Sequence, residues 1–125
     1  MKWFSKLNGI RYASLRYFNA AGYDSKSRII GLEKNPANLL PVIMNSLING
    51  EALNIYGNDY KTKDGTCIRD FIHVNDVVNA VQVMMNNTFR GVIDVGTGVS
   101  NKLVDIADYF KIDYKSVIGG ETERI

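Results

Sequence analysis

The stretch from Tyr12 to Phe18 constrains the fold more strongly than any other part of this chain. It reads YASLRYF, apolar or aromatic at most positions, and it runs into the loop residues Asn-Ala-Ala-Gly at 19–22. Such a composition is typical of a strand buried on both faces, as in a parallel sheet covered by helices. The sequence therefore predicts a mixed α/β fold in which this strand leads directly into a functional loop.

The rest of the sequence predicts short helices and strands in alternation, without internal repeats or a Pro/Ser-rich linker. Helical spacing is found at the helix end Trp3–Leu7, over Leu39–Asn49, from about Asp76 with Val77, Val78, Val81, Met84 and Met85 inward, and after a capping Ser100 with Leu103, Ile106, Ala107 and Phe110 inward. Extended segments are predicted at Ala52–Tyr56, Cys67–Val74, Gly91–Val95 and Tyr114–Ile118.

Length and composition bound the class of protein. A chain of 125 residues with 46% hydrophobic content predicts one ordinary globular domain over residues 1–125. The net charge is only +2 and the basic residues are scattered, so the basic patch of a nucleic-acid-binding protein is missing. No apolar run approaches the roughly 18–20 residues that cross a bilayer, and the first residues lack the apolar segment of a signal peptide. We therefore expect neither a nucleic-acid nor a membrane partner.

Cysteine usage points to the compartment. Cys67 is the only cysteine, which excludes an internal disulfide and a thiolate metal cage. A single thiol fits a reducing environment, so we expect a cytoplasmic protein without a metal site.

A Gly-punctuated acidic loop lies directly before an Arg-Asp pair. Residues 57–76 read GNDYKTKDGTCIRDFIHVND. Arg69, at the end of the loop, is the candidate phosphate ligand, because a guanidinium offers charge and two parallel donors. From the residues alone, an ion pair of Arg69 with Asp70 or a loop carboxylate such as Asp64 is favoured over a phosphate contact.

Other polar residues have two interpretations each. Asn19 and Asn38 stand where an amide or a helix start would face an anion, but asparagine is also common in turns and at N-caps. His73 leads into a helix start, and we interpret it as structural. Gly96-Thr97-Gly98 follows a strand, and we interpret it as a tight turn, since a lone Gly-x-Gly is a weak phosphate signal.

Three segments, in this order along the chain, closely resemble the UDP-glucose 4-epimerases, a family of extended short-chain dehydrogenases/reductases. They are Leu15–Asn19, Asn38–Pro41 and Gly57–Asp76. The Arg-Asp-aromatic-x-His-Val-x-Asp core is common to many nucleotide-sugar epimerases, dehydratases and decarboxylases. The preceding Asn-Asp-Tyr-x-Thr-x-Asp-Gly-Thr loop is the part that points to the 4-epimerases.

The resemblance implies the C-terminal portion of such an enzyme, with part of the Rossmann sheet and a small mixed α/β substrate-binding domain. The family interconverts UDP-glucose and UDP-galactose in galactose metabolism by reversible oxidation at C4 with bound NAD. Its Gly-x-x-Gly-x-x-Gly turn and its catalytic Tyr-x-x-x-Lys are not in this sequence. We therefore expect the N-terminal NAD-binding part to be absent, no catalytic residue in this chain, and neither turnover nor NAD binding by the chain alone.

The resemblance also implies which residues bind ligands. Contacts to the UDP-sugar are implied at Asn19, Asn38, Leu39, Asn54, Ile55, Tyr56 and Arg69. The backbone of Asn54–Tyr56 would read the uracil, and Tyr17 and Phe18 would pass the nicotinamide of NAD. Taken as residues alone, the Asn54–Tyr56 strand fits a core strand equally well, and Tyr17 and Phe18, two aromatics in a strand expected to be buried, would belong to the core by default. Arg124 is a doubtful replacement for the family's second diphosphate arginine.

The apolar strand at Tyr12–Phe18 would be left with an open edge if the Rossmann sheet is missing. We therefore expect a homo-oligomer or pairing with an N-terminal Rossmann half. Two alternatives stay open: another extended short-chain dehydrogenase, such as a nucleotide-sugar dehydratase or decarboxylase, and a non-catalytic UDP-sugar-binding or interaction module.

Overall fold

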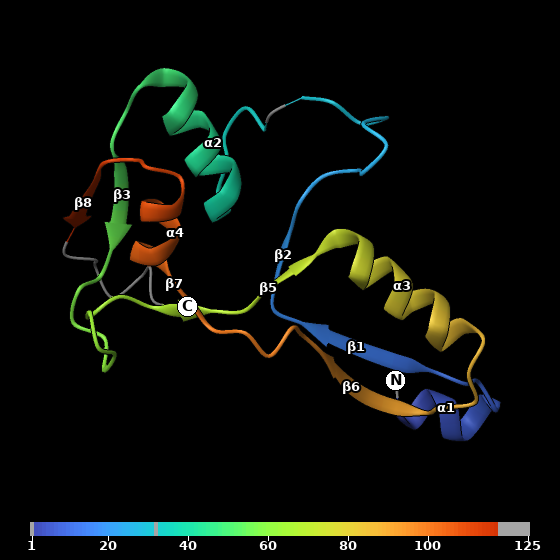
Figure 1. Ribbon diagram of the computed structural model, residues 1–125. Helices are drawn as coiled ribbons and strands as arrows, with labels where there is room; N and C mark the ends of the chain where they lie inside the picture. Colours follow the sequence, from blue (N-terminus) through green and yellow to red (C-terminus); the bar gives the residue numbers. More distant parts are fainter. Residues whose placement is uncertain (1, 32, 118–125) are drawn as a thin grey trace. The chain divides into compact units, whose positions relative to one another are not determined.

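The computed structural model describes residues 2–31 and 33–117 of the chain. They form two compact units, each made of segments that are distant in sequence (Figure 1). Unit 1 comprises Met1–Arg28 and Asp70–Val99, and unit 2 comprises Ile29–Arg69 and Ser100–Ile125. Both units combine parallel strands with helices, so the predicted α/β class is confirmed.

Unit 1 contains two short parallel strand pairs. Its elements are α1 (Lys2–Asn8), β1 (Ala13–Tyr17), β2 (Asn19–Ala21), β5 (Phe71–His73), α3 (Val74–Met85) and β6 (Gly91–Val95). Strand β1 pairs with β6 over its whole length, and β2 pairs with β5. Helix α3 contacts β1, β2 and β5, and covers one face of β1 (Figure 1).

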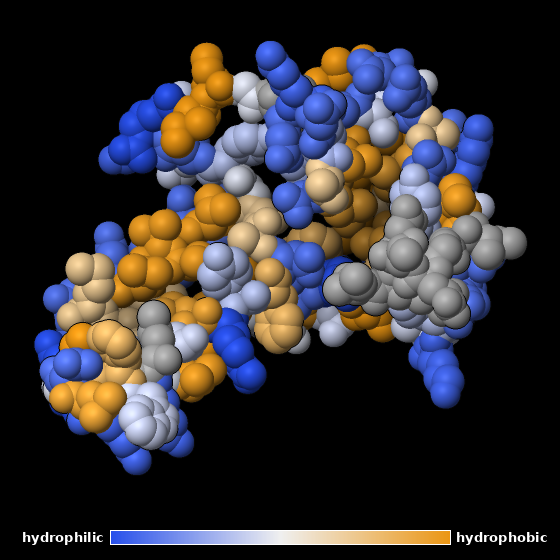
Figure 2. Space-filling model, turned by 180° about the vertical axis from the view of Figure 1, so that it is seen from behind, coloured by the Kyte–Doolittle hydropathy of each residue, from blue (hydrophilic) through white to orange (hydrophobic). Residues whose placement is uncertain are grey.

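Hydrophobic side chains remain exposed over much of unit 1. Tyr17 and Phe18 are 50% and 60% exposed, so the prediction of a strand buried on both faces is wrong. Val78 and Met85 of α3, predicted to face inward, are exposed as well. The reason is that β1 has a strand neighbour on one edge only within the described residues. In the left part of Figure 2, hydrophobic side chains are visible at the surface of unit 1.

Unit 2 holds the hydrophobic core. Its elements are α2 (Leu39–Asn49), β3 (Leu53–Tyr56), β4 (Ile68–Arg69), β7 (Asn101–Lys102), α4 (Leu103–Tyr109) and β8 (Tyr114–Val117). Strand β3 pairs in parallel with β8, and β4 pairs antiparallel with β7. Helices α2 and α4 pack beside β3 (Figure 1), and the buried cluster is formed by Ile43, Leu53, Ile55, Ala107 and Ile112.

The observed boundaries of helices and strands agree with the predicted ones where a glycine marks the end of the segment. Helix α2 has the predicted bounds, with Gly50 in the left-handed conformation at its end (φ 68°). Strand β6 also has its predicted bounds. Helix α4 differs, because Lys102 rather than Ser100 is its N-cap: Asn101 and Lys102 pair with β4. Ile118 and Arg124, which the sequence analysis placed in a strand and a diphosphate contact, lie outside the described residues.

Within residues 2–31 and 33–117, none of the helices combines the length and the apolarity that a membrane span requires. That part of the chain also contains no group of three or more His, Cys, Asp or Glu residues positioned to hold a metal ion.

Candidate functional site

The Gly96-Thr97-Gly98 turn of unit 1 is closed by a carboxylate of the protein itself. The Asp70 carboxylate accepts hydrogen bonds from the Thr97 hydroxyl (2.5 Å), the Gly98 amide (3.0 Å) and the Thr97 amide (3.2 Å). The Thr97 hydroxyl is the main reason why the pKa of Asp70 is lowered, and the two amides add to it. Because these donors are directed at Asp70, the turn is structural and not a phosphate cradle.

Asp70 lies close to the carboxyl ends of β1 and β6, with its carboxylate near Gly96 and its main-chain carbonyl bound to Asn19. A side chain at Gly96 would approach both Asp70 Oδ2, at 2.7 Å, and the Phe18 ring, at 3.1 Å. The Asn19 amide donates to the Asp70 carbonyl oxygen at 3.1 Å. Phe18 and Asn19 are thereby fixed at the carboxyl end of a parallel strand, where open α/β sheets bind ligands.

Removing the Asp70 carboxylate charge should change how stability depends on pH. A lowered pKa in the folded state means that the stabilisation is present above the unfolded-state value of about 3.9 and is lost as pH falls through the lower, folded-state value. We expect Asp70→Asn to unfold at lower denaturant at pH 7 and to lose less further stability than the wild type between pH 5 and pH 3. Urea unfolding at several pH values checks this, and parallel pH profiles would contradict it.

His73 has a structural role, as predicted. Its Nδ1 accepts a hydrogen bond from the Asn75 amide at 3.1 Å and so caps α3. Gly22, at a φ of 95°, leaves the space that the imidazole occupies, since a Cβ there would overlap the ring. Both observations give the imidazole a structural role at the start of α3.

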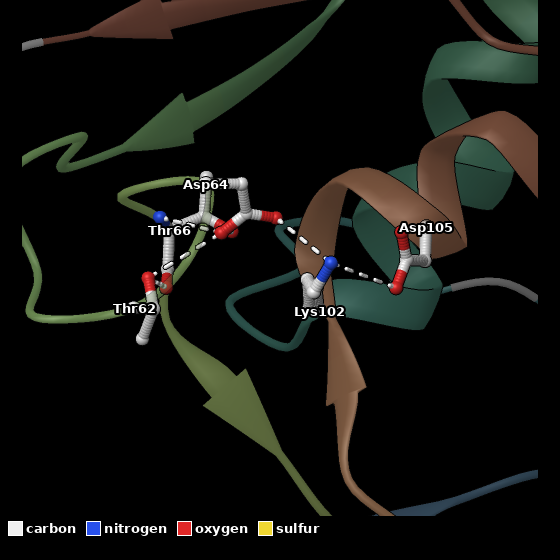
Figure 3. Close-up of polar contacts among 5 residues, drawn as sticks. All are labelled: Thr62, Asp64, Thr66, Lys102 and Asp105. Carbon is white, nitrogen blue, oxygen red and sulfur yellow. Dashed lines mark hydrogen bonds and ion pairs between the residues drawn. The ribbon is translucent and has the colours of Figure 1, made fainter.

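In unit 2, the loop before Arg69 is ordered around Asp64 (Figure 3). Asp64 Oδ1 accepts from the Thr66 amide (3.0 Å) and the Thr66 hydroxyl (3.1 Å), while the Thr62 hydroxyl donates to the Thr66 carbonyl at 2.6 Å. Thr66 is only 2% exposed, so its polar groups are satisfied internally. The pKa of Asp64 is lowered, mainly by the hydrogen bond from the Thr66 amide.

Asp64 also reaches a second strand. Its Oδ2 lies 3.9 Å from Lys102 Nζ in β7, and the same ammonium group lies 3.8 Å from Asp105 Oδ2 (Figure 3). Thr62, Thr66 and Lys102 were not predicted to take part in this arrangement. The Asp-Gly-Thr sequence carried a local signal for it, since aspartate commonly accepts from an amide two residues on.

The Arg69 side chain is exposed and has no polar partner among the described residues of its unit. Among the described residues of unit 2, its guanidinium makes no hydrogen bond or ion pair, and Asp64 is instead bound to Thr66 and Lys102. The alternative in which Arg69 pairs with Asp64 is therefore wrong. Arg69 lies opposite Asn101 and Ile68 lies opposite Lys102. Since alternate residues of a strand face opposite sides, Arg69 and Lys102 are on different faces of the β4–β7 pair.

Strand β3 presents polar and aromatic groups on one face and a core residue on the other. Asn54 and Tyr56 are exposed, whereas Ile55 is 1% exposed and belongs to the core. The amides of Leu53 and Gly57 donate to the carbonyls of Asp113 and Val117, next to and in β8. Backbone groups alternate along a strand, so those of Asn54 and Tyr56 point to the other edge. That edge suits a ligand with amide-like donors and acceptors, and the Ile55 side chain cannot contribute.

The start of α2 provides a further set of donors. Asn38 is the N-cap residue, with φ −93° and ψ 148°, but its side chain makes no capping hydrogen bond. The prediction that Asn38 is the N-cap residue of this helix is confirmed, but its side-chain amide does not cap the helix. Leu39 is half-buried against the core of unit 2, which fixes the helix start.

The predicted site residues divide between the two units. Unit 1 contains Tyr17, Phe18 and Asn19, and unit 2 contains Asn38, Leu39, Asn54, Ile55, Tyr56 and Arg69. A cavity of about 380 Å³ in unit 1 lies elsewhere, at the amino end of β1 beside Arg11, Tyr12 and Met84, and none of the predicted residues lines it.

Comparisons with known proteins agree with this architecture. The model of the NAD dependent epimerase/dehydratase family matches residues 1–96. UDP-glucose 4-epimerase of Lactobacillus helveticus is 40% identical over 108 residues, which cover 81% of this chain and 33% of that protein. The chain thus spans about a third of the length of the curated relatives it matches.

Solved structures show the same likeness. UDP-glucose 4-epimerase of Stenotrophomonas maltophila, with bound NAD and formylated UDP-arabinopyranose, superposes with a TM-score of 0.80 at 27% identity, covering 96% of this chain and 39% of the other. The enzyme of Bifidobacterium longum, in complex with NAD+ and UDP, gives a TM-score of 0.79 at 27% identity, covering 94% and 39%.

Proposed function

Because the chain belongs to the NAD dependent epimerase/dehydratase family, we propose that it supplies UDP-sugar-binding residues to a UDP-glucose 4-epimerase. The observation that carries this proposal is Arg69. It is an exposed guanidinium at the end of an ordered loop, with no charge partner in the described part of unit 2. An arginine in this state can donate two parallel hydrogen bonds to a diphosphate.

The other groups of unit 2 match the remaining parts of a uridine nucleotide. The outer edge of β3 at Asn54 and Tyr56 offers backbone donors and acceptors for the uracil, and the exposed Tyr56 ring offers a wall for the base. The start of α2, at Asn38 and Leu39, offers amides to an anion. We assign Ile55 only to the support of its neighbours.

NAD is the cofactor implied by the family, and the fit of this chain to it is partial. Phe18 and Tyr17 are exposed aromatics at the end of β1 and can line the nicotinamide. Among the described residues, the Gly96-Thr97-Gly98 turn does not fit the pyrophosphate of NAD, because its donors are bound to Asp70. When bound, NAD accepts and returns the hydride at C4 of the sugar.

Turnover by this chain alone is not part of the proposal. The sequence has no Tyr-x-x-x-Lys and no Gly-x-x-Gly-x-x-Gly, so proton transfer and cofactor binding need residues from elsewhere. We propose that these residues come from an N-terminal Rossmann half, which would also cover the exposed apolar surface of unit 1. The alternative way to cover that surface is association between copies of the chain, which would not supply the missing residues. We also propose a cytoplasmic location, because a chain with a single cysteine fits a reducing compartment.

The missing catalytic motif also favours a second candidate, a non-catalytic UDP-sugar-binding module. Mixing the chain with a polypeptide that carries the Tyr-x-x-x-Lys and the Gly-rich turn separates the two. Epimerase activity gained on mixing supports the enzyme, whereas UDP binding without any gain supports the module.

Replacing Arg69 tests the site. A charge-assisted hydrogen bond contributes about 1.5–3 kcal/mol, so Arg69→Ala should weaken UDP binding by about 10- to 100-fold in isothermal titration. Arg69→Lys should give an intermediate loss, because it keeps the charge without the fork. Arg90→Ala, at an exposed arginine of unit 1, is the matched control and should leave the affinity unchanged. An Arg69→Ala affinity equal to that of the wild type would exclude this assignment.

A further inference from the structure

We propose that Asp64 is a positioning residue that holds Arg69 in place for the diphosphate, an inference that rests on the function proposed above. Asp64 does not itself contact the ligand. It acts through the loop and the short strand pair that carry Arg69. All of the residues involved belong to unit 2.

The first step concerns the loop. Asp64 Oδ1 binds both the amide and the hydroxyl of Thr66, and Thr66 is nearly fully buried. Thr62 closes the turn from the other side, through its hydroxyl bond to the Thr66 carbonyl. The position at which the chain leaves the loop, three residues before Arg69, is thereby fixed by one carboxylate.

The second step concerns the strand pair. Strands β4 and β7 pair over only two residues each, Ile68 with Lys102 and Arg69 with Asn101. So short a pair is weakly held by its backbone hydrogen bonds alone. The ion pair between Asp64 and Lys102 joins the loop before β4 to β7, which adds a second attachment between the same two segments.

The third step concerns charge. Lys102 lies on the face of the strand pair opposite to Arg69, between the carboxylates of Asp64 and Asp105. Its charge is therefore balanced within the protein, and Arg69 is left as the cation of β4. The two cations therefore have different roles: Lys102 stabilises the β4–β7 strand pair, and Arg69 binds the ligand.

A double-mutant cycle in the full chain tests the proposal, with UDP as the probe. Asp64→Asn and Lys102→Met should each weaken UDP binding by about 3- to 10-fold, as expected for the loss of positioning, and neither should weaken it further in an Arg69→Ala background. Asp105→Asn is the matched control, because Asp105 touches the same lysine but not the loop, and it should leave the affinity unchanged.

Hydrogen exchange gives a readout that needs no ligand. In Asp64→Asn, the amides of residues 66–69 and 101–102 should lose protection while those of β3 and β8 keep theirs. Equal protection in the variant would overturn the proposal, and so would an Asp64→Asn loss of affinity that persists in the Arg69→Ala background. If Arg69→Ala weakens UDP binding but Asp64→Asn and Lys102→Met do not, this inference fails alone. If the wild-type chain binds no UDP, the proposed function fails and this inference fails with it.

Discussion

Replacing Ile55 with alanine should lower the free energy of unfolding by about 2–5 kcal/mol, the range for deleting a buried aliphatic side chain. Ile55 is 1% exposed and packs in the cluster with Ile43 and Ala107, where the surrounding helices cannot close the resulting cavity fully. Urea unfolding followed by far-ultraviolet circular dichroism measures the change.

The neighbouring residues of the same strand are matched controls for Ile55. Asn54→Ala and Tyr56→Ala change exposed positions, so each should alter the free energy of unfolding by less than about 1 kcal/mol. Tyr56→Ala should nevertheless weaken UDP binding, because it removes the wall for the base. If Tyr56→Ala destabilised the chain as much as Ile55→Ala does, the account would be contradicted. The residues of β3 would then not alternate between the core and the face assigned to the ligand.

Gly65→Ala should also have a large effect, on both stability and ligand affinity. Gly65 has a φ of 77°, and a left-handed residue with a side chain costs about 1–3 kcal/mol. A Cβ at this position would in addition overlap the backbone carbonyl oxygen of Asn58. Backbone cannot move aside as a flexible side chain can, so the whole loop before Arg69 must change shape. We expect a lower unfolding midpoint and a lower UDP affinity.

Gly50→Ala distinguishes the effect of backbone strain from the effect of steric overlap. Gly50 has a similar φ of 68°, but no atom lies within 4 Å of a Cβ built there. It should therefore cost only the conformational penalty, about 1–2 kcal/mol, and leave UDP affinity unchanged. Equal effects of the two substitutions on UDP affinity would show that the loop does not depend on Gly65.

The sequence was most informative where local signals agree. Helix α2 has its predicted bounds because an asparagine precedes it, Pro41 stands in its first turn and Gly50 follows it. Strand β6 lies between a glycine at its start and Gly96 after it, and was also located correctly. His73 was interpreted as structural because it leads into a helix start, and the structure shows it as the N-cap of α3.

Features that depend on long-range pairing could not be predicted. Nothing near Ile68 indicates that it pairs with Lys102, and this pairing displaces the helix start from Ser100. The exposure of Phe18 was missed for a related reason: a sequence shows that a segment is apolar but not which neighbours cover it. For Asp64, a motif indicated an acidic loop, but its attachment to β7 becomes visible only in three dimensions.

The central claim is that unit 2 binds a uridine diphosphate through β3, the start of α2 and Arg69. Amide chemical-shift mapping of the full chain during a UDP titration tests it most directly. The account predicts saturable shifts that are largest at Leu39, Asn54, Tyr56 and Arg69 and small at Thr97 and Gly98, whose amides are bound to Asp70. Shifts centred on Gly96–Gly98, or none in the folded chain, would contradict it.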